Sequence, residues 1–271
     1  MKPYRGPRLA SVVTHLVLAA LYIPIASVAI NSFNADDRLA TWGGPTLRWW
    51  TQALGDARVR TDLLASLTIG LSTTVISVAV AVLTGLWWRH ASPRARRVMD
   101  VLTSARIMLP EVVLAVGLFL LAERAALPLG ASAIVAGQVV FCSAYAAVVI
   151  QARLAVLGTA LEDAAADLGA SPSRVFGRVT LPLLAPAILA AALLVFTFSL
   201  DDVVIAQFLG GTETETLPVL LLGKIRLTVS PEVNAIGTGL LLITAVPVMV
   251  LLAAGRLPLP ARRRSTPGGE R

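Results

Sequence analysis

Long apolar runs that lack charged residues restrict most strongly what this chain can fold into. Four of them exceed the roughly 20 residues that a helix needs to cross a bilayer, namely 63–88, 125–152, 179–200 and 233–255. A fifth run, 9–35, contains only His15, which can be neutral, and a sixth, 98–121, contains Asp100, Arg106 and Glu111. Because the bilayer core offers backbone groups no other partner, each span must be helical. The sequence therefore predicts an all-α membrane protein whose single domain, 1–271, has six transmembrane helices, at about 9–32, 63–88, 98–121, 131–152, 183–209 and 233–255.

The composition agrees with a membrane protein and gives no sign of an enzyme. Only 14% of the residues are charged, whereas a soluble domain has about 25%. The chain contains no glycine-rich phosphate loop, no zinc-type Cys/His spacing and no plausible nucleophile–base set. We therefore predict no catalytic residue, no metal site and no cofactor bound by this chain. The single cysteine, Cys142, lies in an apolar run and is expected to be a small buried residue.

The basic residues are distributed unevenly between the two sides of the predicted membrane domain. The net charge of +7 could suggest nucleic acid as a partner. However, clusters of Lys and Arg precede the first span, separate spans two and three and spans four and five, and follow span six, whereas the opposite loops mix both signs. This pattern places both termini and the loop at 153–182 in the cytoplasm of a cell whose plasma or inner membrane holds the protein. The basic tail Arg262–Arg264 is expected to lie near anionic membrane lipid.

The cytoplasmic segment 159–182 is unusually polar for this chain and begins with a predicted short helix. Thr159 followed by Glu162 has the spacing of a capping box, in which each side chain satisfies the other residue's backbone amide. Small and apolar residues then recur at helical spacing, while Glu162 and Asp163 lie near the positive end of the helix. A helix that lies on anionic lipid should be basic on its polar face. The acidic rim therefore favours docking into a shallow groove on another protein.

The second half of this segment predicts a sharp turn and another helix. Gly158 should end the incoming helix, and Gly169 should adopt the left-handed conformation that follows a helix C-terminus. Ser171 can cap the next helix, whose first turn accommodates Pro172. Leu181-Pro182 then leads into span five, where a bend is expected.

These residues resemble a loop motif of the integral-membrane subunits of ATP-binding-cassette (ABC) importers. That motif reads Glu-Ala-Ala, three residues, Gly, nine residues, Ile, one residue, Leu-Pro. Here Asp163-Ala164-Ala165, Gly169, Val179 and Leu181-Pro182 fall on its positions. Asp163 replaces the glutamate, with Glu162 just before it, and Val179 replaces the isoleucine. Further strings resemble the second permease of spermidine/putrescine importers: Leu21-Tyr22-Ile23-Pro24, Asn31-Ser32-Phe33-Asn34, Leu109-Pro110-Glu111, Ser199-Leu200-Asp201-Asp202-Val203-Val204 and Ser230-Pro231-Glu232-Val233-Asn234-Ala235.

The resemblance implies a type I importer permease that carries a small cationic solute, in particular a polyamine, by alternating access. It also implies three partners: a second homologous permease, a dimer of ABC ATPases that binds ATP and Mg, and an extracytoplasmic substrate-binding protein. The segment 159–182 would be the loop that couples this chain to the ATPase, through Glu162, Asp163, Ala164, Ala165, Gly169, Arg174, Leu181 and Pro182. An importer permease for another small solute is a second interpretation. A stand-alone secondary transporter is a third, although the inverted halves common in that class are not evident.

Three carboxylates lie within or at the ends of predicted spans, where charge is costly and usually faces a cavity. They are Glu111, Asp201 and Asp202. Adjacent helical residues point about 100° apart, so we expect Glu111 and only one of the pair to line a cation pathway. Aromatic faces can assist cation binding, and Tyr22, Phe198 and Trp50 are the candidates. The alternative is that these acids pair with Arg106 or with arginines of a partner subunit and simply hold helices together.

Overall fold

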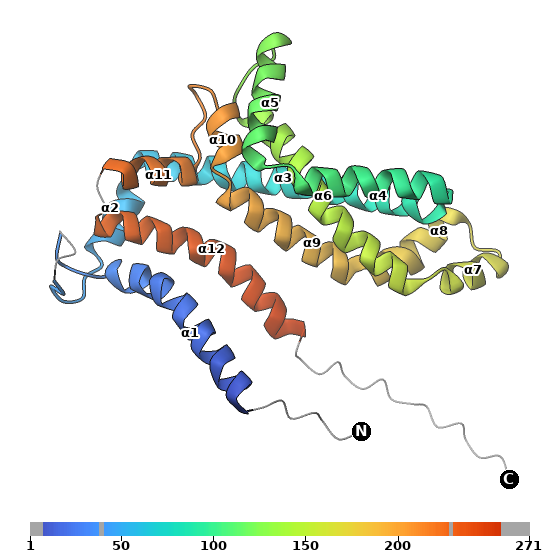
Figure 1. Cartoon of the computed structure of the whole chain (residues 1–271), viewed down its shortest axis with the longest axis horizontal. Helices are drawn as coiled ribbons and strands as arrows, with labels where there is room; N and C mark the ends of the chain where they lie inside the picture. The colour runs from blue at the N-terminus through green and yellow to red at the C-terminus, as the bar shows by residue number, and fades with distance from the viewer. Residues whose placement is uncertain (1–7, 38–40, 228–229, 256–271) are drawn as a thin grey trace.

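The computed structural model describes residues 8–37, 41–227 and 230–255. Within these ranges the chain is helical apart from its loops and one isolated bridge between Asn34 and Pro45. The long helices are α1 (Arg8–Asn31), α3 (Ala57–His90), α6 (Ala131–Leu157), α9 (Leu181–Asp201) and α12 (Pro231–Gly255) (Figure 1). The shorter ones are α2 (Arg48–Gly55), α4 (Pro93–Met108), α5 (Glu111–Arg124), α7 (Ala160–Asp167), α8 (Pro172–Val175), α10 (Val204–Leu209) and α11 (Leu217–Leu227), with a π-helix at Phe176–Thr180. The tail Arg262–Arg264 lies outside the described residues.

The helices confirm an all-α membrane protein but correct the shape of two predicted spans. Five helical stretches are long and apolar enough to cross a membrane, and a sixth span results if α4 and α5 are taken together. These two helices meet at 99°, so the third span, predicted at 98–121, is not one continuous helix. The fifth span, predicted at 183–209, is also interrupted, because α9 ends at Asp201 and α10 begins at Val204.

The bend between α4 and α5 has a local cause at Leu109 and Pro110. Proline has no N–H to donate, and its ring disfavours helical backbone at the preceding residue. Leu109 accordingly adopts an extended conformation, with φ −67° and ψ 129°. The helix restarts at Glu111. Glu111 therefore lies at the bend between α4 and α5 and not within a straight transmembrane helix.

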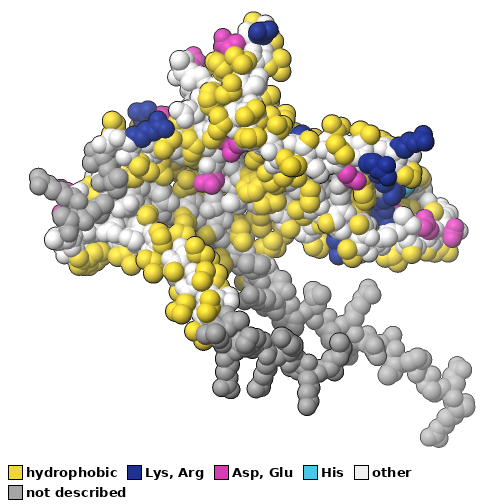
Figure 2. All heavy atoms as spheres, in the orientation of Figure 1, with side chains coloured by type: hydrophobic (Ala, Val, Ile, Leu, Met, Phe, Trp, Pro, Cys, Tyr) yellow, Lys and Arg dark blue, Asp and Glu magenta, His cyan; other side chains and the backbone are white. Residues whose placement is uncertain are grey.

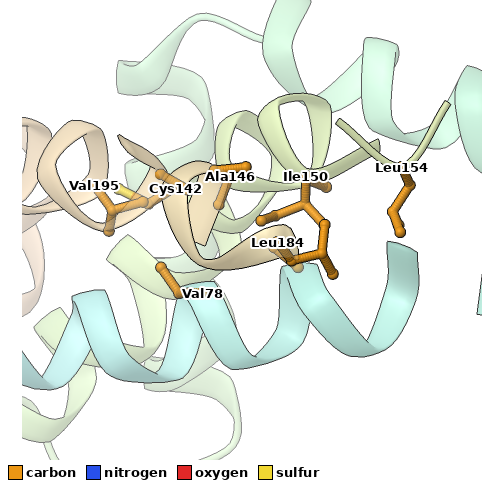
Figure 3. Packing of buried hydrophobic residues seen from close by; sticks show 11 residues of the cluster. Val78, Cys142, Ala146, Ile150, Leu154, Leu184 and Val195 are labelled. Atoms are coloured by element: carbon orange, nitrogen blue, oxygen red, sulfur yellow. The ribbon is translucent and has the colours of Figure 1, made fainter. Parts of the chain in front are cut away.

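The core of the molecule is the contact of α3, α6 and α9; α3 runs along the long axis of the molecule, and α6 slants across the view in Figure 1. Figure 3 shows Val78 of α3, four α6 residues from Cys142 to Leu154, and Leu184 and Val195 of α9 meeting in one cluster. Cys142 is buried, as the sequence predicts. Small residues bring the helices close, as is usual within membranes: a Cβ added to Gly85 would lie 2.9 Å from Cγ2 of Ile150.

The first and last spans form a separate layer at the side of this core. α1 packs on α12, and in Figure 1 the two helices lie side by side and diverge from α3, α6 and α9. Apolar side chains of α1 are exposed along its length, including Leu16 at 65% and Tyr22 at 64%. Figure 2 shows hydrophobic side chains over the middle of one face, and Lys and Arg mostly towards the two ends of the molecule and the tip of α5. Such apolar surface fits contact with lipid or with another membrane subunit.

Candidate functional site

The backbone of the segment 159–182 folds as the glycines predict. Gly158 ends α6 with φ +60°, and Gly169 follows α7 with φ +81°. The N–H of Gly169 donates to the carbonyl of Ala166 at 2.8 Å, and that of Ala170 donates to the carbonyl of Ala165 at 3.1 Å. These two bonds are the Schellman pattern that closes a helix on a left-handed residue. The prediction for Gly169 is therefore confirmed.

The predicted side-chain caps are not formed. Thr159 has a backbone close to helical, with φ −109° and ψ −10°, and its side chain makes no capping bond. Since a capping threonine needs extended backbone to reach the N3 amide, the predicted capping box is wrong. Ser171 is extended but its hydroxyl makes no capping bond either, while Pro172 lies in the first turn of α8 as predicted.

Glu162 instead joins the predicted coupling segment, residues 159–182, to two other parts of the chain. Its Oε1 accepts from Nη1 of Arg89 at 2.8 Å and from Oγ1 of Thr180 at 2.6 Å. The Arg89 and Glu162 side chains are only 7% and 18% exposed. The pair therefore connects the end of α3, the start of α7 and the π-helix that leads into α9. The neighbouring Asp163, which occupies the motif's acidic position, is exposed.

A groove lies between this segment and the end of α3. It encloses about 430 Å³ and is lined by residues of α3, α7, α8, the π-helix and the turns between them: Leu86, His90, Thr159, Glu162, Asp163, Ala166, Ala170, Pro172, Val175, Phe176 and Thr180. Ala164 and Arg174 are exposed and Ala165 is partly exposed. Leu161 and Leu168 project apolar side chains, 58% and 90% exposed. A helical segment with exposed apolar residues and an acidic rim, such as 159–182, is suited to docking against another protein.

The helix continues into α9 without a break and contains a π-helix. The chain stays helical from Pro172 to Asp201, with π-helical bonding over Phe176–Thr180 immediately before Leu181 and Pro182. A proline ring clashes with the carbonyl four residues earlier in an α-helix. The wider π-turn relieves this clash, and such turns often occur at functional sites.

A second polar group lies inside the membrane domain, around Asp202. Its Oδ2 accepts from Nε2 of Gln138 at 2.7 Å, and its Oδ1 accepts from the backbone N–H of Ile205, in the first turn of α10, at 2.9 Å. The Oε1 of Gln138 also accepts from the hydroxyls of Thr73 and Ser199. Asp202 directly follows α9, at the end of the fifth helical span away from 159–182 as the sequence predicts, and Gln138 links it to Thr73, which lies midway along α3.

Glu111 and Asp202 are brought together, and Asp201 is turned away. The Glu111 carboxyl lies close enough to the Asp202 carboxyl for the two to interact electrostatically, although Glu111 begins α5 and Asp202 follows α9. Asp202 is 8% exposed, whereas Asp201 is exposed. Among the described residues, Arg106 forms no ion pair with these acids. It donates instead to the carbonyl of Val140 and the hydroxyl of Ser143.

The three candidate aromatic residues do not form one site. Phe198 lies one turn before Asp202 and packs edge-on against Tyr145, with ring centroids 5.0 Å apart. Trp50 stacks on Phe33 at 5.6 Å in the α2 region, and Tyr22 is exposed on α1. Only Phe198 is therefore near the carboxylates. Sequence analysis missed Gln138, although it is one of only two amide side chains in the apolar run 125–152 and the one further from its end, which is a usable signal.

Similarity to known proteins decides the family. Residues 77–260 match the family described as "Binding-protein-dependent transport system inner membrane component". The chain belongs to this family. It is 35% identical to the putrescine transport system permease protein PotI of Escherichia coli K12 over 240 residues, 86% of this chain and 85% of that protein. It is 31% identical to the spermidine/putrescine transport system permease protein PotC of Haemophilus influenzae, over 87% of this chain and 91% of that one.

The fold agrees with this assignment. A bacterial ABC transporter that imports the acidic polysaccharide alginate aligns with a TM-score of 0.65 and 13% identity, over 94% of this chain and 100% of that one. Another chain, from the MetNI methionine ABC transporter, aligns with a TM-score of 0.53 and 16% identity, over 74% and 95%. The chain is thus an inner-membrane permease of the type I importer fold and not itself an enzyme. Permeases of this kind work with a second permease, ATPase subunits and a binding protein.

Proposed function

We propose that this permease carries a polyamine such as putrescine or spermidine into the cell. The observation that carries the proposal is the proximity of Glu111 to Asp202, whose carboxyl belongs to the Gln138 network between α3, α6 and α9. The relatives PotI and PotC, named for polyamine transport, support the same substrate class. Because the same fold also serves an acidic polysaccharide importer, the fold alone does not select the solute. The two carboxyl groups favour a cation.

The two acids have different parts in this proposal. Both Asp202 oxygens are held by the chain's own donors, so this side chain is fixed in place. Glu111 is only partly buried, and Asp202 is the side chain that interacts with its carboxyl. Among the described residues no donor is hydrogen-bonded to the Glu111 carboxyl, so in the proposal this carboxyl accepts from a passing ammonium group while Asp202 adds negative potential. Phe198 supplies an aromatic face one helical turn away.

The segment 159–182 would transmit the force for this movement. In the proposal its exposed residues, among them Asp163, Arg174 and Leu168, contact an ABC ATPase that binds ATP and Mg, and two such ATPases close on each other. Glu162 passes the displacement to α3 through Arg89 and to α9 through Thr180. The nucleotide state would then bias a rigid-body switch between two conformations. The binding protein delivers the solute at the opposite end.

The test is uptake of labelled putrescine and spermidine by the assembled transporter in proteoliposomes, energised with ATP. Glu111→Gln removes a charge-assisted hydrogen bond worth about 1.5–3 kcal/mol, so KM should rise roughly tenfold or more. Glu123→Gln is the matched control, because Glu123 lies on the same helix but is exposed. Asp201→Asn should likewise change little. The proposal fails if Glu111→Gln and Glu123→Gln transport alike.

The same assay separates the alternatives. An importer for another small solute would hydrolyse ATP with its own loaded binding protein but would not accumulate either polyamine. A stand-alone secondary transporter would accumulate solute in vesicles without ATPase. No uptake without ATPase and ATP is the result that the proposal requires.

A further inference from the structure

A polar pocket lies at the end of the molecule away from the coupling segment. It encloses about 410 Å³ between the start of α3, α10, α11 and the loop that joins α10 to α11. Arg58 and Asp62 come from α3, Gln207 from α10, and Gly211, Thr212, Glu213, Thr214 and Glu215 from the loop. Asp62 and Arg89 are 27 residues apart on the same helix, which corresponds to about 40 Å. The pocket therefore faces the opposite side of the membrane from Arg89 and Glu162.

The charges of this pocket are not balanced. Arg58 donates to Oε2 of Glu215 from both Nε, at 3.1 Å, and Nη2, at 2.6 Å. Arg58 is the one basic residue of the lining, and its charge is already paired with that of Glu215. Glu213 is exposed. Asp62 remains as the buried acidic group in the wall, with no basic residue left in the lining to compensate it.

Asp62 is held in an unusual environment for a carboxyl group. It is only 5% exposed, and its Oδ2 has no hydrogen-bond partner. One turn further along α3, Oγ of Ser66 accepts from the backbone N–H of Leu217 at 2.8 Å. This bond holds the start of α11 against α3 beside the pocket. A buried carboxyl group without a partner is costly and, in a membrane protein, usually serves a cation or a pathway.

The pocket also has a fixed relation to the Glu111–Asp202 pair. Gln207 lies on α10, and a backbone N–H in the first turn of α10 donates to Asp202. Along α3, Asp62 precedes Thr73, which contacts Gln138 of the Asp202 network, by 11 residues, or about 16 Å. Two acidic groups therefore follow one another from the outer end towards the middle of the core.

We propose that the Asp62 pocket is an entry site that captures an ammonium group of the substrate before it reaches Glu111. This inference rests on the proposed function, because it takes the substrate to be an organic cation. The Asp62 carboxyl binds the ammonium group directly, and Gln207, Thr212 and Thr214 offer neutral oxygen acceptors around it. The Arg58–Glu215 ion pair leaves this acceptor free of competition from the arginine.

The first test measures polyamine uptake by the full transporter as a function of substrate concentration. Asp62→Asn keeps the size of the side chain and removes its charge, so KM should rise roughly tenfold with little change in maximal rate. Asp37→Asn is the control, because it removes one acidic charge from an exposed residue of the outer loop outside this pocket. Equal kinetics for the two variants would overturn the proposal. Reduced recovery of the assembled complex with unchanged KM would also overturn it, since Asp62 would then pair with a neighbouring subunit.

A second test does not depend on polyamine transport. Gln207→Cys places an exposed thiol in the pocket, and the native Cys142 is only 1% exposed. We expect this thiol to react faster with aminoethyl methanethiosulfonate, which carries an ammonium group, than with a neutral hydroxyethyl reagent. Adding Asp62→Asn should reduce that ratio several-fold, whereas adding Asp37→Asn should not. An unchanged ratio rejects the site even if polyamine uptake is confirmed, and a reduced ratio supports it even if the natural solute is another cation.

Discussion

Two groups of polar side chains in this permease connect helices, one around Gln138 and one around Glu162. Gln138 joins α3, α6 and α9 through Thr73, Ser199 and Asp202. Glu162 joins the coupling segment to Arg89 and Thr180. In both cases the polar atoms are shared by elements far apart in sequence. Such networks favour one arrangement of the helices. In any other arrangement a buried donor or acceptor would lose its hydrogen-bond partner, and its desolvation would not be compensated.

The Arg89–Glu162 ion pair should stabilise the protein, and its two residues should act as a unit. Glu162→Gln leaves a nearly buried guanidinium without its counter-charge, so the midpoint of heat-induced aggregation in detergent should fall. Arg89→Gln should have a similar effect, and the double variant should be no worse than the poorer single variant. Asp163→Asn, one residue away and exposed, should leave the midpoint unchanged. Additive losses in the double variant would show that the two residues do not interact.

At the scale of elements, the length and hydrophobicity of each apolar run predict the long helices well and the short ones poorly. The five long apolar helices correspond to predicted spans because each one alone satisfies the length required by the bilayer. The outer helix α2 was missed, although Trp49 and Ala53 are buried with the spacing of one helical turn. Pro110 predicts a bend but not its angle. The angle and the proximity of Glu111 to Asp202 depend on packing between distant segments, to which a single sequence gives no access.

The close approach of α6 and α10 depends on Gly137. A Cβ added there would lie 2.6 Å from Cδ1 of Leu209 and 2.8 Å from Cγ2 of Ile205. Gly137→Val should therefore displace α10 and cost about 1–3 kcal/mol of stability, seen as a lower yield of monodisperse protein. Gly117→Val is the control, since a Cβ at Gly117 meets nothing within 4 Å. Similar yields for the two variants would contradict this view of the contact.

The turn between α7 and α8 depends on the conformation of Gly169 and not on space. A Cβ there meets nothing within 4 Å, but φ is +81°. A left-handed conformation costs an ordinary residue about 1–2 kcal/mol, and Asn tolerates it better than others. Solute moved per ATP hydrolysed should consequently decrease in the order wild type, Gly169→Asn, Gly169→Ala, with Gly169→Asp also uncoupled and membrane insertion intact. Gly177→Ala, in open space without positive φ, should transport normally.

At the scale of the whole molecule, the two ends carry different tasks. One end holds the Arg89–Glu162 pair and the groove beside the coupling segment. The other holds the Asp62 pocket and a group of ion pairs in which Lys224 contacts both Asp56 and Glu232. Between them lie the Glu111–Asp202 pair and the packed core of α3, α6 and α9. Within the part of the chain that the structure describes, α3, α6 and α9 connect the two ends.

This division predicts the orientation of the chain in the membrane, which the basic loops suggest. Ser173 of α8 and Glu213 of the α10–α11 loop are both exposed, and the native Cys142 is buried. In sealed right-side-out vesicles, a membrane-impermeant thiol reagent should label Glu213→Cys and leave Ser173→Cys unlabelled until the membrane is permeabilised. Inverted vesicles should give the reverse pattern. Labelling of Ser173→Cys from outside would place the coupling segment away from any cytoplasmic ATPase, and the proposed transmission of force to α3 and α9 would then be impossible.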